Sequence, residues 1–260
     1  MSEDELEKWQ EIKDKEEENG IKIGNTIIRK NLFLEYPKAA RHYLSLFPNN
    51  YLDIKVLQNI ERLTSLNKSF LKKINSDSVI ENQLLNFINN NNAYHIIASI
   101  LKAEFNFGHH EAYIFPEFML GNTYRADYLL VGKNSGGYEF TFIELESPKG
   151  NITLKSGEKG EVIRKGIKQV RDWNIWLESN YSNLIETFKR YKHPKKALPE
   201  SFYKLDKSRI HYVVVAGRRE DFKERTYRIK RDLKSSSKIT LLHYDNLYDN
   251  ANKIVGENTY

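Results

Sequence analysis

The residues best suited to chemistry are three carboxylates near the middle of the chain. Asp127 lies in the stretch Arg-Ala-Asp-Tyr, and Glu144 and Glu146 lie two positions apart in the stretch Phe-Ile-Glu-Leu-Glu. Residues two apart on a β-strand project from the same face, and a hairpin with a short turn would bring Asp127 beside Glu144. Carboxylate oxygens are the ligands that Mg²⁺ and Mn²⁺ prefer, so the pattern predicts a divalent-cation site.

Such a site is suited to the hydrolysis of phosphodiester bonds. A bound cation polarises the phosphate, orients a water molecule and lowers the pKa of that water. Two other interpretations stay open: Glu144 and Glu146 form the solvent face of an edge strand, or the carboxylates form a purely structural ion cluster. Ile143 and Leu145 supply apolar side chains for the opposite face. We therefore expect an interior strand, where neighbouring carboxylates need a cation or a proton for compensation.

The surrounding sequence predicts the elements that hold these carboxylates. A polar loop over 150–160 precedes a long helix whose buried stripe is Ile163, Ile167, Val170, Trp173 or Asn174, and Leu177. Strands are expected over 112–118, 126–131, 138–145, 210–216 and 239–243, and a basic helix over 222–233. Three consecutive strands followed by a crossover helix and a buried strand predict an α/β fold, a mixed sheet flanked by helices.

Residues 1–75 are expected to form a mainly helical accessory region, and residues 76–260 the α/β domain. Within the first region, residues 21–29 predict a short strand or hairpin around Gly24-Asn25, and residues 37–47 predict a short helix. The first 18 residues are strongly acidic and predict a charged helix.

Two helix starts are predicted from side chains that can cap a first turn. Asp53 is expected to begin one helix whose apolar positions run to Leu66. Ser76 or Ser78 is expected to begin the next helix, which carries Leu84 and other apolar residues.

Composition narrows the classes of function. Lys and Arg number 41 against 35 Asp and Glu, for a net charge of +6, which favours a polyanionic partner. The basic runs 189–196 and 218–234 predict surfaces that face either phosphates or solvent. The chain has no cysteine, which excludes disulfides and thiolate sites and favours the cytoplasm. It also lacks a run of about 18 apolar residues, so we expect no membrane span.

These motifs resemble the PD-(D/E)xK nuclease superfamily and, more narrowly, the C-terminal nuclease domain of Shedu antiphage defence proteins. The resemblance covers about residues 79–251 and rests on the order of several segments. They are a helix with Glu81, PEFMLGNTYRADYLLV (116–131), FIELESPKG (142–150), KQVRDWNIWL (168–177), VVVAGRR (213–219) and LLHYDNLYDNA. The resemblance implies a restriction-endonuclease-like fold and a Mg²⁺- or Mn²⁺-dependent DNA endonuclease or nickase. Members of this fold often pair, which implies a homo-oligomer by analogy.

The resemblance also implies roles for individual residues. Asp127 and Glu144 match the two metal ligands of the superfamily. Gln169, four residues before a Trp, matches a glutamine on the crossover helix that helps fix the site or the phosphate of the strand. Glu81 matches a helix carboxylate that often completes the metal shell. The superfamily lysine is expected at position 146, where this chain has glutamate.

Three explanations of Glu146 stay open. Glu146 can be a third ligand and general base, as in the ExE variant of some restriction enzymes of this fold. A lysine from elsewhere, Lys149 or Lys165, can instead enter the site. In the third explanation catalysis is weakened or lost, and the domain binds DNA and metal only. The basic residues expected to guide the DNA backbone are Lys155, Arg164, Lys165, Lys168 and Arg171.

Overall fold

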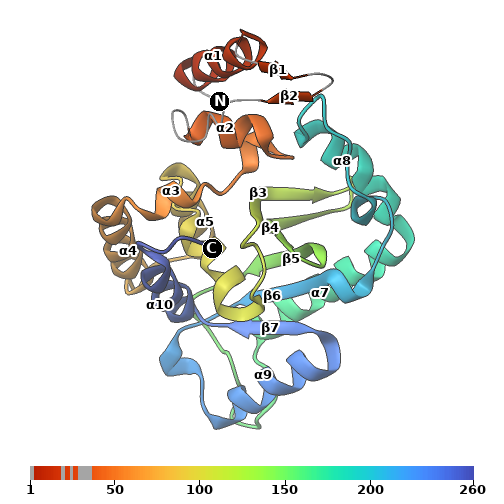
Figure 1. The fold of residues 1–260 in the computed structure, drawn as a ribbon. Coiled ribbons are helices and arrows are strands. Elements are labelled where there is room, and N and C mark those ends of the chain that lie inside the picture. Colours follow the sequence, from red (N-terminus) through yellow and green to blue (C-terminus); the bar gives the residue numbers. More distant parts are fainter. Residues whose placement is uncertain (1–2, 19–20, 24–25, 29–36) are drawn as a thin grey trace.

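The chain folds around a five-stranded mixed sheet (Figure 1). The computed structural model describes residues 3–18, 21–23, 26–28 and 37–260. The strands, in their order across the sheet, are β3 (Glu111–Leu120), β4 (Tyr124–Asn134), β5 (Gly137–Leu145), β6 (Ile210–Val215) and β7 (Ile239–Leu242). The first three are antiparallel neighbours, and β5, β6 and β7 are parallel. The predicted α/β class, with a mixed sheet flanked by helices, is confirmed.

Helices cover both faces of the sheet. They are α5 (Glu81–Asn90), α6 (His95–Ile100), α7 (Glu161–Asn180), α8 (Leu184–Tyr191), α9 (Glu224–Ser237) and α10 (Tyr244–Ile254). On one face α7 and α8 pack against alternate residues of β5, including Phe142. On the other face α5, α6 and α10 pack against Ile143 and Leu145. The stripe predicted for α7 is buried as expected, with Trp173 rather than Asn174 inside. None of the described helices is long and apolar enough to cross a membrane.

The N-terminal region is mainly helical, as predicted. Its elements are α1 (Glu3–Glu18), β1 (Ile21–Ile23), β2 (Thr26–Ile28), α2 (Pro37–Leu44), α3 (Ile54–Leu57) and α4 (Ile60–Ile74). The short strands pair antiparallel, as the predicted hairpin requires, and its turn at Gly24-Asn25 lies outside the described residues. Apolar residues of α3 and α4 pack in one cluster with α10. The boundary between residues 75 and 76 stays a prediction.

The single helix predicted from Asp53 through residue 66 is wrong, because the chain forms two helices there. The Asp53 carboxylate accepts a hydrogen bond from the Lys55 amide at 2.9 Å and caps only the short α3. Asn59 then provides a second cap, since its Oδ1 accepts from the Arg62 amide at 3.2 Å. Two side-chain acceptors six residues apart satisfy two sets of first-turn amides, so the chain can turn between them.

The predicted serine cap of α5 is also wrong. Ser76 and Ser78 face each other, with their hydroxyl oxygens 3.4 Å apart, and α5 begins only after Ile80. The Ile80 amide donates instead to Gln83 Oε1 at 3.3 Å, which is the half of a capping box that an apolar cap residue can still form. This later start makes Glu81 the first residue of the helix, where a carboxylate is favoured by the helix dipole.

Candidate active site

Asp127 and Glu144 lie on neighbouring strands at the point where those strands separate. The last paired rung between β4 and β5 joins Tyr128 to Ile143, so Asp127 and Glu144 occupy the next position. There Asp127 Oδ2 accepts a hydrogen bond from the Leu145 amide at 2.7 Å, so a side chain continues the pairing. The hairpin therefore brings the two carboxylates together as its register requires, and holds Asp127 against β5.

Glu144 and Glu146 are carried into the interior by the alternation of β5. Their exposed fractions are 3% and 2%, and β5 lies between β4 and β6, so the solvent-face interpretation is wrong. Glu144 Oε2 and Glu146 Oε1 have no hydrogen-bond partner among the residues that the structure describes. Buried polar atoms are nearly always hydrogen bonded, so two unpartnered carboxylate oxygens on residues two apart call for a ligand or a proton.

Sequence reasoning missed two residues that position Glu146. Gly166 lets α7 approach the sheet, since a Cβ there would lie 2.6 Å from Val214 Cγ1 and 3.0 Å from Glu146 Cγ. Tyr244, the first residue of α10, donates its hydroxyl to the Glu146 carbonyl oxygen at 2.7 Å. A glycine inside an amphipathic helix was the available signal for Gly166, because such a glycine costs helix stability unless close packing needs it.

Lys165, from α7, bridges two of the carboxylates. Its Nζ lies 2.8 Å from Glu146 Oε2 and 3.6 Å from Glu81 Oε2. Burial lowers the pKa of Lys165, but the hydrogen bond and charge of Glu146 outweigh it and raise the pKa above its ordinary value, so Lys165 is charged. Of the two lysines considered as replacements at this site, Lys165 reaches the carboxylates, whereas Lys149 lies 4.0 Å from the exposed Asp77.

Burial and mutual charge favour the neutral forms of the strand carboxyls. Burial, reinforced by Asp127 and Glu146, raises the pKa of Glu144 to about 10. Burial also raises the pKa of Asp127 to about 7, although the hydrogen bond from the Leu145 amide opposes the shift. The pKa of Glu146 is raised by burial as well, against the opposing effect of Lys165. Strong shifts of this kind concentrate at functional sites.

The carboxylates do not yet form a closed ligand set. Within residues 3–18, 21–23, 26–28 and 37–260, no group of three or more His, Asp or Glu side chains has the arrangement of a metal site. In this arrangement Glu146 Oε2 accepts a hydrogen bond from Lys165, and Asp127 accepts one from the Leu145 amide. The donor chemistry nevertheless fits Mg²⁺ or Mn²⁺, since Asp127, Glu144 and Glu146 all offer hard carboxylate oxygens and two of those oxygens have no described partner.

Gln169 and all of the predicted DNA-contacting residues except Lys155 lie on two adjacent rows of α7. Gln169 follows Lys165 by one turn and is half-buried, so both lie on the site side of the helix. Arg164, Lys168 and Arg171 are exposed, form no ion pair with any described residue, and line a groove of about 730 Å³ beside α9. Other groove residues are Gly157, Glu158, Lys159, Ile167, Asp172, Ile175 and Ile229. Lys155 is exposed in the preceding loop, outside the groove lining.

Replacing Glu144 with glutamine should stabilise the metal-free protein. The folded-state pKa of Glu144 is raised from 4.5 to about 10, so its contribution to stability is complete below about pH 4.5 and is lost as the pH rises towards 10. We expect Glu144→Gln to raise the free energy of unfolding at pH 7.5 in EDTA by about 1–3 kcal/mol, or Tm by several degrees. The gain should vanish near pH 4.

The matched control is Glu139→Gln, on the same strand at the far end of the sheet. Glu139 is half-buried and accepts a hydrogen bond from His211 at 3.0 Å, so its replacement should give no gain. Thermal unfolding of the three proteins at both pH values is the measurement. A Tm for Glu144→Gln at or below that of the wild type at pH 7.5 would contradict the electrostatic account.

Comparison with known proteins identifies the family. Curated proteins give no match to this chain. The family model described as Shedu protein SduA, C-terminal, matches residues 78–248, which is well over half of the chain. The matched range contains the whole five-stranded sheet, the four site carboxylates and Lys165. The chain therefore belongs to the Shedu family of antiphage proteins, and residues 78–248 are its SduA C-terminal domain.

Proposed function

We propose that this protein is a Mg²⁺- or Mn²⁺-dependent nuclease that hydrolyses phosphodiester bonds of DNA, as an endonuclease or nickase, in defence against phage. The observation that carries the proposal is the pair of unpartnered, buried oxygens of Glu144 and Glu146 beside Asp127. Together with membership of the Shedu family, this pair supports a cation-dependent reaction on a phosphate substrate. Location in the cytoplasm and assembly into a homo-oligomer stay predictions.

Each side chain of the site has its own proposed role in phosphodiester hydrolysis. Asp127, Glu144 and Glu146 would hold the ion, which would supply polarisation of the phosphodiester. Lys165 Nζ donates a hydrogen bond to a non-bridging phosphate oxygen as negative charge develops there. Glu146, released from Lys165, accepts a proton from the attacking water. Gln169, one turn along α7, donates its amide to the same phosphate.

These roles combine two of the three explanations for the glutamate at position 146: Glu146 as ligand and general base, and a lysine that enters the site from elsewhere. The 2.8 Å contact between Lys165 and Glu146 supports a lysine supplied by α7 in place of the one expected at position 146. The carboxylate of Glu146 keeps its own role as ligand and general base. A second candidate function is a catalytically silent DNA-binding module, and the same contact favours it if Lys165 never leaves Glu146.

Loss of the Asp127 carboxylate should abolish nicking. With supercoiled plasmid and Mg²⁺ or Mn²⁺, we expect Asp127→Asn to reduce the nicking rate at least about 100-fold, because a ligand and its charge are removed. EDTA should have the same effect on the wild type. Asp77→Asn, which changes an exposed carboxylate, is the matched control and should retain wild-type activity. Equal nicking by Asp127→Asn and the wild type would reject the nuclease and leave the binding module.

Removing the charge of Lys165 or of Lys149 shows which of these two lysines acts in the reaction. Lys165→Met should lower kcat by about 100-fold or more, because donors aimed at developing charge typically contribute that much. Lys149→Met should change kcat by less than about threefold. Single-turnover cleavage at saturating metal is the measurement. A large loss in Lys149→Met with normal cleavage by Lys165→Met would reverse the assignment.

We also propose that the groove along α7 binds the DNA backbone. Three of the four cations that line it, Arg164, Lys168 and Arg171, follow the helical period of α7, so they can contact successive phosphates beside the site. Replacing Arg164, Lys168 and Arg171 with Ala should flatten the slope of log Kobs against log salt concentration by about 2–3. The control removes three exposed lysines from α3 and α4, namely Lys55, Lys68 and Lys72. An equal change of slope in both triple variants would contradict the proposal.

A further inference from the structure

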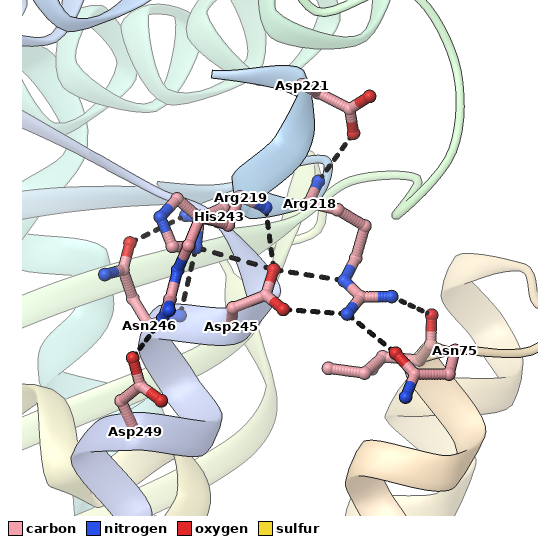
Figure 2. A network of polar contacts seen from close by, with 9 residues as sticks. Asn75, Arg218, Arg219, Asp221, His243, Asp245, Asn246 and Asp249 are labelled. Carbon is pink, nitrogen blue, oxygen red and sulfur yellow. Dashed lines mark hydrogen bonds and ion pairs between the residues drawn. The ribbon is translucent and has the colours of Figure 1, made fainter. Parts of the chain in front are cut away.

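Arg218 is a buried cation at the junction of three segments (Figure 2). It follows β6, is 9% exposed, and pairs with both carboxylate oxygens of Asp245 through Nε and Nη2 at 3.0 and 2.7 Å. Its other donors reach the Ile74 carbonyl and Asn75 Oδ1. The interpretation of the basic run 218–234 as facing phosphates or solvent is therefore wrong for Arg218, because protein acceptors occupy its guanidinium.

On one side Arg218 anchors the segment that carries Glu81. Ile74 is the last residue of α4 and Asn75 is its C-cap, so the guanidinium binds the negative end of the helix dipole. Only residues 76–80 separate this anchor from Glu81, the first residue of α5. The position of the anchor therefore limits where Glu81 can lie.

On the other side the ion pair adjoins the groups that hold the backbone of Glu146. Gly217, next to Arg218, donates its amide to the Ser147 carbonyl at 3.0 Å and accepts from the Tyr244 amide at 3.1 Å. Tyr244, which precedes Asp245 in the chain, donates its hydroxyl to the Glu146 carbonyl. Figure 2 shows the carboxylate of that aspartate between the guanidinium and the Arg219 amide, which lies 2.7 Å away.

We propose that Arg218 is a positioning residue of the site: by clamping the end of α4 to the start of α10, it sets the separation of Glu81 and Glu146. Lys165 bridges those two carboxylates, so their spacing decides whether one side chain can reach both. A forked guanidinium suits this task, since it binds a carboxylate through two parallel hydrogen bonds and still has donors for other acceptors. The inference rests on the proposed function for its catalytic consequence only.

Hydrogen exchange of the full chain tests the clamp without requiring metal or activity. In Arg218→Ala we expect the backbone amides of 76–85 and 143–150 to exchange at least about tenfold faster, while those of the distal β4–β5 turn keep their rates. Arg218→Lys should be intermediate, because it keeps the charge but has too few donors to make all four hydrogen bonds to Asp245, Ile74 and Asn75.

The matched control is Arg209→Ala, at the opposite end of the sheet. Arg209 also has several acceptors, including the Gly136 carbonyl at 2.7 Å and the Tyr138 carbonyl at 3.3 Å, but none is near the site. It should lower Tm without accelerating exchange at 76–85 or 143–150. If Arg218 contributed to stability only, Arg218→Ala would likewise lower Tm without accelerating exchange in these two segments.

Calorimetric titration with Mn²⁺ gives a second measurement. We expect about tenfold weaker binding in Arg218→Ala and wild-type binding in Arg209→Ala, because residues that orient ligands typically contribute this much. Wild-type exchange at both segments of Arg218→Ala, or of Arg218→Lys if the first variant does not fold, would overturn the clamp. Absence of Mn²⁺ binding by the wild type would overturn the proposed function alone, and exchange would still decide the role of Arg218.

Discussion

The burial of like-charged carboxylates at one end of β5 determines which groups must surround them. Alternation along the strand places Glu144 and Glu146 in the interior, where unpaired carboxylates cost free energy. The surroundings compensate in three ways: an amide donates to Asp127, Lys165 binds Glu146, and protonation is favoured at Glu144. Two oxygens still lack partners. Under the proposed function, a bound cation would compensate the charge of these carboxylates.

Close approach of α7 makes this compensation possible. Gly166 allows the helix backbone to pack against Val214 and Glu146, and the preceding residue, Lys165, then reaches the carboxylates. Because α7 turns by about 100° per residue, its adjacent rows face the site and the basic groove. Under the proposed function, this one helix would bring a phosphate backbone and the charged donor Lys165 to the same place. α7 lies within the part of the chain that matches the Shedu family.

Support for the site comes from parts of the chain that are far apart in sequence. Tyr244 binds the Glu146 carbonyl from α10, and Arg218 joins α10 to the end of α4. The N-terminal helices α3 and α4 pack in the same cluster as α10, so they also support the carboxylate end of the sheet. In metal sites generally, loss of a residue that orients a ligand typically costs about 10–100-fold in affinity or activity.

The sequence by itself determined the strand pattern, the buried stripe of α7 and the adjacency of Asp127 and Glu144. These depend on local rules, namely a period of two in strands, 3.6 in helices, and the register that a hairpin turn imposes. Only the tertiary structure decided that Lys165 rather than Lys149 reaches Glu146, and that Arg218 is buried in an ion pair. Both outcomes depend on how separate elements pack. Contacts between side chains of elements that are far apart in the sequence produce no repeating pattern of residue types from which they could be predicted. The two corrected helices have a related origin: Asp53 and Asn59 each cap a helix where one helix was predicted, and α5 begins after the apolar Ile80 rather than at a serine.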